Sequence, residues 1–198
     1  MKRVALALSF LLGFLLSCAP TVPVPPEPIP ARTILVLPPE SLTSNTDILE
    51  TLYPIISKRL AQRGYYCISP ELALAIFNAN NMNNAGRINS VPPKKLLEIF
   101  GADAVLKTKV TEWSSKYYVV GASVNVGLSM DLYTAKSDAP IWSRQEHRSS
   151  ETNIKDQRIW ILIDAILHSA LEKYEPIADS AAISMFQSIP PGPLYGTH

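Results

Sequence analysis

The feature that most restricts the fold is a strict alternation of apolar and polar residues in the second half of the chain. A period of two is typical of a β-strand with one face on a core, because successive side chains point to opposite faces. The pattern predicts one long strand from Tyr118 to Leu132. Its core face would carry Tyr118, Val120, Ala122, Val124, Val126, Leu128, Met130 and Leu132, and its polar face Ser123, Asn125, Gly127, Ser129 and Asp131.

Shorter segments predict the strands that accompany it. Residues 32–38 contain a continuous apolar run, Ile34–Leu37, stopped by Pro38 and Pro39, which favours a strand buried on both faces. Residues 65–69 and 102–113 read as two further strands. After a turn at residues 135–138, the segment from Pro140 to His147 is expected to pair back as the last strand of a hairpin.

Helices are expected where apolar residues recur at helical intervals. Asp47 and Glu50 stand at capping-box spacing before the first helix, in which Pro54 would cause a kink or mark the first turn. The Asn-rich residues 78–84 are typical of a turn. The expected helices run from Ile48 to Gly64, from Pro70 to Phe77, from Lys94 to Phe100, from Ile154 to Tyr174 and from Ile177 to Gln187.

This order of elements predicts a single α/β domain. Its mixed five-stranded sheet would have a parallel start and an antiparallel hairpin finish, with helices packed on it. Right-handed crossovers place the first strand between the second and third, which gives the spatial order 2-1-3-4-5. With 198 residues, of which 47% are hydrophobic, one packed core is expected. We expect the domain to span residues 32–190 and a tail to span residues 191–198.

The amino terminus has the composition of an export signal. Two bases precede an uninterrupted run of thirteen apolar or small residues, Val4–Leu16. A membrane span needs about 20 residues, so this run is instead typical of a signal peptide. The following Leu15-Leu16-Ser17-Cys18 resembles the bacterial lipobox. The resemblance implies removal of residues 1–17 and attachment of lipid, including palmitate, to Cys18. The alternative is an ordinary signal peptide with an incidental cysteine.

A proline-rich tether follows the cysteine. Residues 19–31 read APTVPVPPEPIPA, with six prolines. Such a segment favours polyproline II at about 3.1 Å per residue and can span roughly 40 Å between a membrane and a folded domain. Ala19 directly follows Cys18, whereas an Asp at this position would resemble an inner-membrane retention signal. We therefore expect the inner leaflet of a bacterial outer membrane, with the protein facing the periplasm.

Charge gives no indication of nucleic-acid binding. The chain has 18 Lys and Arg against 17 Asp and Glu. Loss of Lys2 and Arg3 with the export signal would leave 16 bases. Because nucleic-acid-binding domains carry a marked excess of basic residues, no nucleic-acid partner is expected.

The sequence patterns of common catalytic sites do not occur. There is no G-x-S-x-G, no Walker lysine loop, no G-x-G-x-x-G after a strand and no H-E-x-x-H. His147, His168 and His198 have no metal-ligand spacing. Cys67 is expected to be a buried strand residue. The carboxylates with surface or capping explanations are Glu71, Asp103, Glu112 and Asp131. We therefore expect no enzyme activity, no metal and no cofactor.

Five segments together carry a resemblance to a known family. They are Ile34–Pro39, Leu60–Tyr66, Leu96–Leu106, the strand at Tyr117 and the pair Ile141–Trp142. The chain resembles the meningococcal-antigen type of lipoprotein, a family of unknown function, from the lipobox to about residue 190. The resemblance implies a fold similar to the TolB amino-terminal domain and to CsgG-type lipoproteins, in whose operons family members often occur. It implies an envelope assembly or transport accessory, with a CsgG-type lipoprotein as a candidate partner and no catalytic residues.

The main functional hypothesis is therefore a non-enzymatic, lipid-anchored periplasmic protein that binds other envelope proteins in a transport, secretion or assembly system. A homodimer is a further candidate assembly. The polar face of the long strand would meet water, another part of this chain or a partner protein. Its candidate contact residues are Ser123, Asn125, Ser129 and Asp131.

Two other functions stay open at this stage. A small-ligand or glycan-binding lipoprotein would use a pocket at the carboxyl ends of the parallel strands, near Pro38-Pro39-Glu40 and Ser69-Pro70-Glu71. A hydrolase with an unrecognised site is the remaining alternative.

Overall fold

A computed structural model describes residue 29 and residues 31–42, 48–118, 121–153 and 170–195. The expected export signal, the lipidation site Cys18 and most of the tether lie outside these ranges. So do residues 154–169, which make up most of the helix expected to end at Tyr174.

The described strands form one mixed sheet. Parallel pairing joins β1 (Thr33–Val36) to β3 (Tyr66–Cys67) and to β4 (Ala104–Tyr118). Antiparallel pairing joins β4 to β5 (Gly121–Thr134) and β5 to β6 (Trp142–Asn153). The order β3-β1-β4-β5-β6 confirms the predicted 2-1-3-4-5 order and α/β class.

A sixth strand, β2 (Glu40–Ser41), was not predicted. It pairs in parallel with β4 outside the main order of strands. Two residues that follow two prolines have no periodicity, so the pattern predicts only five strands.

Local signals set the boundaries of several helices. Ser69 Oγ accepts a hydrogen bond from the Leu72 amide at 3.1 Å at the start of α3, and Gly101, with φ of 62°, ends α5. Helix α4 was not predicted, although the Asn84 side chain caps it. The described helices are α2 (Ile48–Gln62), α3 (Pro70–Ala79), α4 (Ala85–Ser90), α5 (Pro93–Phe100) and α7 (Ala170–Phe186).

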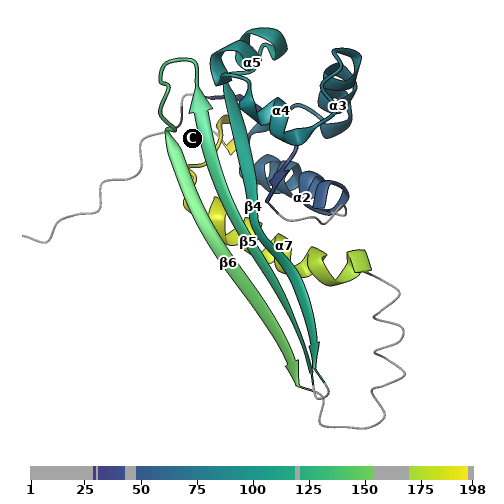
Figure 1. Ribbon diagram of the computed structural model, residues 1–198. Coiled ribbons are helices and arrows are strands. Elements are labelled where there is room, and N and C mark those ends of the chain that lie inside the picture. The colour runs from purple at the N-terminus through teal and green to yellow at the C-terminus, as the bar shows by residue number, and fades with distance from the viewer. Residues whose placement is uncertain (1–28, 30, 43–47, 119–120, 154–169, 196–198) are drawn as a thin grey trace, which may run out of the picture.

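Helices cover the two faces of the sheet unequally (Figure 1). One core cluster joins α2 and α7 to strand residues that include Ile34, Val36 and Leu128. A smaller cluster joins α3, α4 and α5 to the opposite side of β1 and the start of β4, through Leu35 and Val105. β1 is therefore buried on both faces, as predicted, whereas β4, β5 and β6 extend well beyond the second helix layer.

The predicted boundary between the third and fourth strands was wrong. β4 continues past Trp113 to Tyr118, and Tyr118 pairs with Gly121 at the start of β5. The alternation predicts one strand because Val119 and Val120, between the two strands, are apolar and only the following Gly121 could indicate a turn. β6 also continues beyond the predicted end at His147 to Asn153.

The predicted separation of the two carboxyl-terminal helices was also wrong. α7 runs through Pro176 to Phe186. A proline inside a helix removes one backbone hydrogen bond. Here Pro176 is exposed, and Tyr174 and Ala178 on either side of it are buried in the core, so packing keeps the helix continuous. α2 likewise continues through the exposed Pro54.

The chain after α7 packs against the connection between α2 and β3. The Gly192 amide donates to the Arg63 carbonyl at 2.7 Å, and the Leu194 amide donates to the Gly64 carbonyl at 3.0 Å. Residues Pro193–Tyr195 form a short 3₁₀ turn. Among the described helices, none combines the length and the apolar character needed to cross a bilayer.

Candidate interaction face

One face of the β4–β6 sheet is polar over most of its length. Residues directly opposite in antiparallel strands point to the same side, so the strand register assigns each side chain to a face. Below the helix layer, and among the residues whose side chains the structure describes, this side of β4, β5 and β6 carries only Gly and polar or charged residues. We call this surface the polar sheet face; its members are Lys109, Glu112, Ser114, Lys116, Ser123, Asn125, Gly127, Ser129, Asp131, Ser143, Gln145, His147, Ser149 and Glu151.

The structure places the four sequence-predicted contact residues on this one face. Asn125, Ser129 and Asp131 are half-buried, and Ser123 is only 7% exposed. Ser123 is small and lies between two longer side chains, Lys116 on β4 and Glu151 on β6. The face is therefore a surface of packed polar side chains, from which Ser123 contributes little accessible area.

Hydrogen bonds between neighbouring strands order part of this surface. Ser143 Oγ donates to Asp131 Oδ1 at 2.6 Å, from β6 to β5. Asn125 Nδ2 lies 3.5 Å from Ser114 Oγ on β4, at the limit of a hydrogen bond. Side chains held in this way lose less conformational entropy when a partner binds than free side chains would.

The centre of the face holds a His–Glu contact that no pattern in the sequence predicts. His147 and Glu112 lie opposite the same residue, Gly127 of β5, in register. Because Gly127 has no side chain, Nδ1 of His147 comes within 3.4 Å of Glu112 Oε2, and Ser114 Oγ donates to Glu112 Oε1 at 3.0 Å. No periodic pattern indicates this pair, since only the strand register brings position 112 to position 147.

A lysine marks the border between the polar sheet face and the helix layer. Lys107 Nζ donates to the carbonyl oxygens of Asn89 at 2.5 Å and Val91 at 3.3 Å, and lies 5.6 Å from the centre of the Tyr133 ring. Burial lowers the pKa of Lys107. The Asn89 side chain donates to the Pro38 carbonyl at 2.9 Å. These contacts fasten the α4–α5 connection to the sheet, and the open face begins beyond them.

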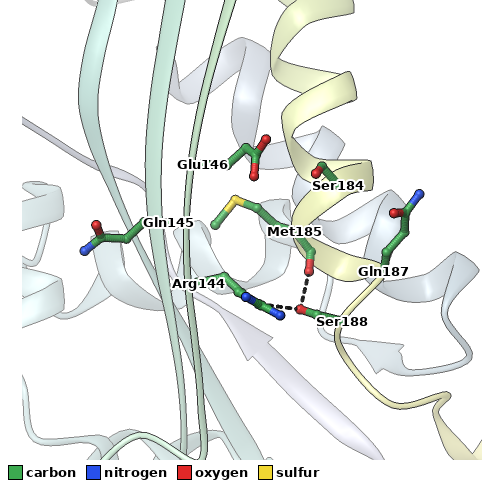
Figure 2. A pocket seen from close by; sticks show the side chains of 7 residues that line it. All are labelled: Arg144, Gln145, Glu146, Ser184, Met185, Gln187 and Ser188. Carbon is green, nitrogen blue, oxygen red and sulfur yellow. Dashed lines mark hydrogen bonds between the residues drawn. The ribbon is translucent and has the colours of Figure 1, made fainter.

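A shallow cavity of about 380 Å³ lies on the opposite side of β6, against the end of α7 (Figure 2). Arg144 Nε donates to Ser188 Oγ at 2.9 Å, and Trp142 Nε1 lies 3.2 Å from the same oxygen. Gln145 points to the other side of the strand in Figure 2, as the alternation requires. Trp142 is half-buried and stacks on Phe186 with ring centres 5.9 Å apart, so it packs against the end of α7.

A second cavity, of about 290 Å³, lies past the carboxyl end of β1. Pro39, Glu40, Asn84 and Gly86 are among the residues that line it. The other group expected at a ligand pocket, Ser69-Pro70-Glu71, does not line this cavity. Ser69 instead caps α3, and Pro70 begins that helix. Of the two groups expected at a ligand pocket, only Pro38-Pro39-Glu40 contributes to this cavity, through Pro39 and Glu40.

Two titratable groups, Cys67 and Asp103, have a pKa that the surrounding structure shifts. Burial raises the pKa of Cys67 to about 12, so its thiol stays protonated at neutral pH. The Asp103 carboxylate accepts the amides of Arg32 and Thr33, each at 2.9 Å, and these bonds lower its pKa. No group of three or more His, Cys, Asp or Glu with the arrangement of a metal site occurs in this part of the chain.

Comparisons with known proteins support the resemblance found in the sequence. A family model described as "Putative lipoprotein GNA1162-like" matches residues 28–197. A curated relative, "Putative lipoprotein NMB1124/NMB1162" of Neisseria meningitidis serogroup B, is 27% identical over 160 residues, which cover 77% of this chain and 74% of the relative. Neither description mentions a reaction.

Solved structures agree with this relationship. The crystal structure of lipoprotein GNA1162 from Neisseria meningitidis has a TM-score of 0.58 and 26% identity, over 71% of this chain and 98% of that chain. PelC from Paraburkholderia phytofirmans, solved as a dodecamer, has a TM-score of 0.51 and 18% identity, over 81% of this chain and 88% of that chain. The second likeness concerns the fold alone.

Proposed function

This chain belongs to the GNA1162-like lipoprotein family, and on that premise we propose that it is an outer-membrane-anchored periplasmic lipoprotein that binds other envelope proteins. It would act without catalysis, as a component of a transport, secretion or assembly system. The polar sheet face would be the surface that contacts the partner.

The observation that carries this proposal is the composition of the polar sheet face. Three strands of 15, 14 and 12 residues carry polar side chains and Gly on one side, beyond the reach of α3, α4 and α5. The face contains Lys109 and Lys116 as well as Glu112, Asp131 and Glu151, so both signs of charge are available. Such a surface stays soluble when it is free and can still form many hydrogen bonds to a partner.

The proposed anchor places this face at a distance from the membrane. Lipid on Cys18 would hold the chain in the inner leaflet of the outer membrane, and residues 19–31 would separate the domain from the lipid surface. A CsgG-type lipoprotein is a candidate partner through the resemblance described above. PelC, which shares the fold, was solved as a dodecamer, so assembly of several copies of this chain is a further candidate.

The test uses two arginines on the polar sheet face. Asn125→Arg with Ser129→Arg adds bulk and charge at half-buried positions, whereas Ser123 is too enclosed to be a clean probe. The matched control is Ala61→Arg with Ala79→Arg, at exposed helix positions. Each full-length variant is crosslinked in native membranes and purified, and the attached proteins are identified by mass spectrometry.

The two variants should give different results. We expect the face variant to lose partners that the wild type and the control variant retain, with melting temperatures within about 2 °C of each other, since surface substitutions change stability little. An identical set of partners for a folded face variant would refute the proposal.

A second candidate function is small-ligand or glycan binding at the cavity beyond β1. The observation in its favour is that Pro39 and Glu40 line a cavity of about 290 Å³ where a pocket was expected. Calorimetric titration of the purified protein with periplasmic sugars and peptidoglycan fragments tests it. Saturable heat that Glu40→Gln removes would support this function over protein binding.

A further inference from the structure

β6 forms the long edge of the described sheet. It stands at one end of the strand order, and no other described strand pairs with its outer side. It has 12 residues, whereas β3 at the opposite edge has two. Figure 1 shows β6 running along the margin of the sheet. An edge of this length presents a row of backbone N–H and C=O groups to which another strand can pair.

β6 lacks several features that usually block such pairing. Its sequence contains no Pro and no Lys, and its register with β5 is continuous from Trp142 to Asn153 without a bulge. Residues 143–151 are exposed, apart from Glu146, which is half-buried. Specific pairing at this edge therefore depends on its charges rather than on a steric block.

The charges of β6 favour one particular pairing with a second copy. In an antiparallel pair of identical strands related by a two-fold axis normal to the sheet, one residue lies opposite itself. With His147 on the axis, Glu146 of each copy lies opposite Arg148 of the other. The paired segment would then run from Trp142 to Thr152, nearly the whole of β6.

The neighbouring registers are unfavourable. A shift must occur in steps of two residues, because a shift of one would turn every side chain to the other face. One such step places Glu146 opposite itself and Arg144 opposite Arg148. The step in the other direction places Arg148 opposite itself. Like charges directly opposite one another destabilise a strand pair, so the charges disfavour both shifts.

We propose that β6 pairs with β6 of a second copy of this chain, antiparallel and centred on His147, so that two sheets join into one. Glu146 and Arg148 lie on the helix-covered side of β6, whereas the polar sheet face is formed by the alternate residues. Substitutions of Glu146 and Arg148 therefore leave the residues of the polar sheet face unchanged, so failure of this pairing can be distinguished from failure of partner binding by that face.

The register is tested by thiol crosslinking of the full-length protein in native envelopes. Single variants His147→Cys, Gln145→Cys and Ser149→Cys are made with Cys67→Ala and treated with a short bismaleimide. Residue 147 would lie opposite itself, whereas residues 145 and 149 would each lie about 14 Å from their own copies, at about 3.4 Å per residue.

We expect a covalent dimer for His147→Cys and for the double variant Gln145→Cys with Ser149→Cys, but not for the two single controls. Absence of a dimer at position 147, or equal crosslinking at all three positions, would overturn the register.

A charge exchange tests the contact between copies. Glu146→Arg alone places Arg opposite Arg148, and Arg148→Glu alone places Glu opposite Glu146. Each single variant also loses the contact of 2.8 Å between Arg148 Nε and Glu146 Oε1 within one chain. A mixture of the two variants restores opposite charges only between chains, so it separates pairing from stability of the monomer.

Two differently tagged copies of each variant are co-expressed and recovered through one tag. We expect co-recovery to fall about tenfold for each single variant, since two cross-strand contacts turn from attraction to repulsion. It should return to the wild-type level when Glu146→Arg and Arg148→Glu are expressed together. Unchanged co-recovery in the single variants, or no return in the mixture, would refute the pairing.

Discussion

Nδ1 of His147 lies 3.4 Å from Oε2 of Glu112, and the two side chains reach each other across Gly127 of the strand between them. An ideal Cβ at position 127 would lie 2.6 Å from Thr111 Oγ1 and 3.1 Å from both the Cβ and the backbone nitrogen of Glu112. The register shift between Val110 and Glu112 brings these atoms close to β5. The absence of a side chain at position 127 is therefore required by the local geometry of the bulge.

Gly127→Val should reduce the free energy of unfolding by about 2 kcal/mol, because its side chain would have to displace the Thr111 hydroxyl and the bulged backbone. Urea denaturation followed by circular dichroism measures this change. Ser129→Val, at a half-buried position on the same face, is the control and should change stability by less than about 0.5 kcal/mol. Equal effects of the two substitutions would contradict a special role of Gly127.

Trp142→Ala should destabilise the protein by about 2 kcal/mol, below the range for fully buried tryptophans, because Trp142 is only half-buried. The variant loses the stack on Phe186 and the contact with Ser188. Trp142→Phe should keep most of the packing and lose less. Thermal unfolding measures all three proteins, with Ile141→Ala at the exposed neighbouring position as the control. A wild-type melting temperature for Trp142→Ala would rule out a packing role.

Cys18→Ala should abolish incorporation of labelled palmitate and release the protein from the membrane fraction. Of the two cysteines in the sequence, only Cys18 follows a lipobox-like segment. An acyl anchor contributes about 0.8 kcal/mol for each buried CH₂ group. Cys67→Ala is the matched control and should be labelled like the wild type. Labelling that persists in Cys18→Ala would show that the lipid is attached elsewhere.

Asp103→Asn should lower stability at neutral pH, and the difference from the wild type should shrink in acid. The Arg32 and Thr33 amides lower the pKa of Asp103 in the folded state, so its contribution is present above the ordinary Asp pKa of about 3.9 and is lost as pH falls through the lower folded value. Because Asp103 is exposed, we expect a loss below about 1 kcal/mol.

Urea midpoints of the wild type and Asp103→Asn between pH 7 and pH 2.5 measure this dependence. Asp138→Asn, an exposed turn position, is the control. If the difference in urea midpoint between the two proteins stays constant down to pH 2.5, the charge of the Asp103 carboxylate does not contribute to stability through the Arg32 and Thr33 amides.

The order of strands followed from local signals in the sequence. The apolar run at β1, the proline and serine that begin α3 and the glycine that ends α5 each act within a few residues, so they could be read without neighbours. The right-handed crossover then left one arrangement for the parallel strands. The common face of Ser123, Asn125, Ser129 and Asp131 also followed from the period of two.

Other features depend on contacts between distant residues. Packing of Tyr174 and Ala178 keeps α7 continuous through Pro176, although local propensity predicts a break there. The burial of Ser123 depends on Lys116 and Glu151, and the approach of His147 to Glu112 depends on the bulge in β4. The alternation determined which side chains share a face, because it is a property of one strand. The tertiary structure decided which of them meet, because register joins residues that are far apart in the chain.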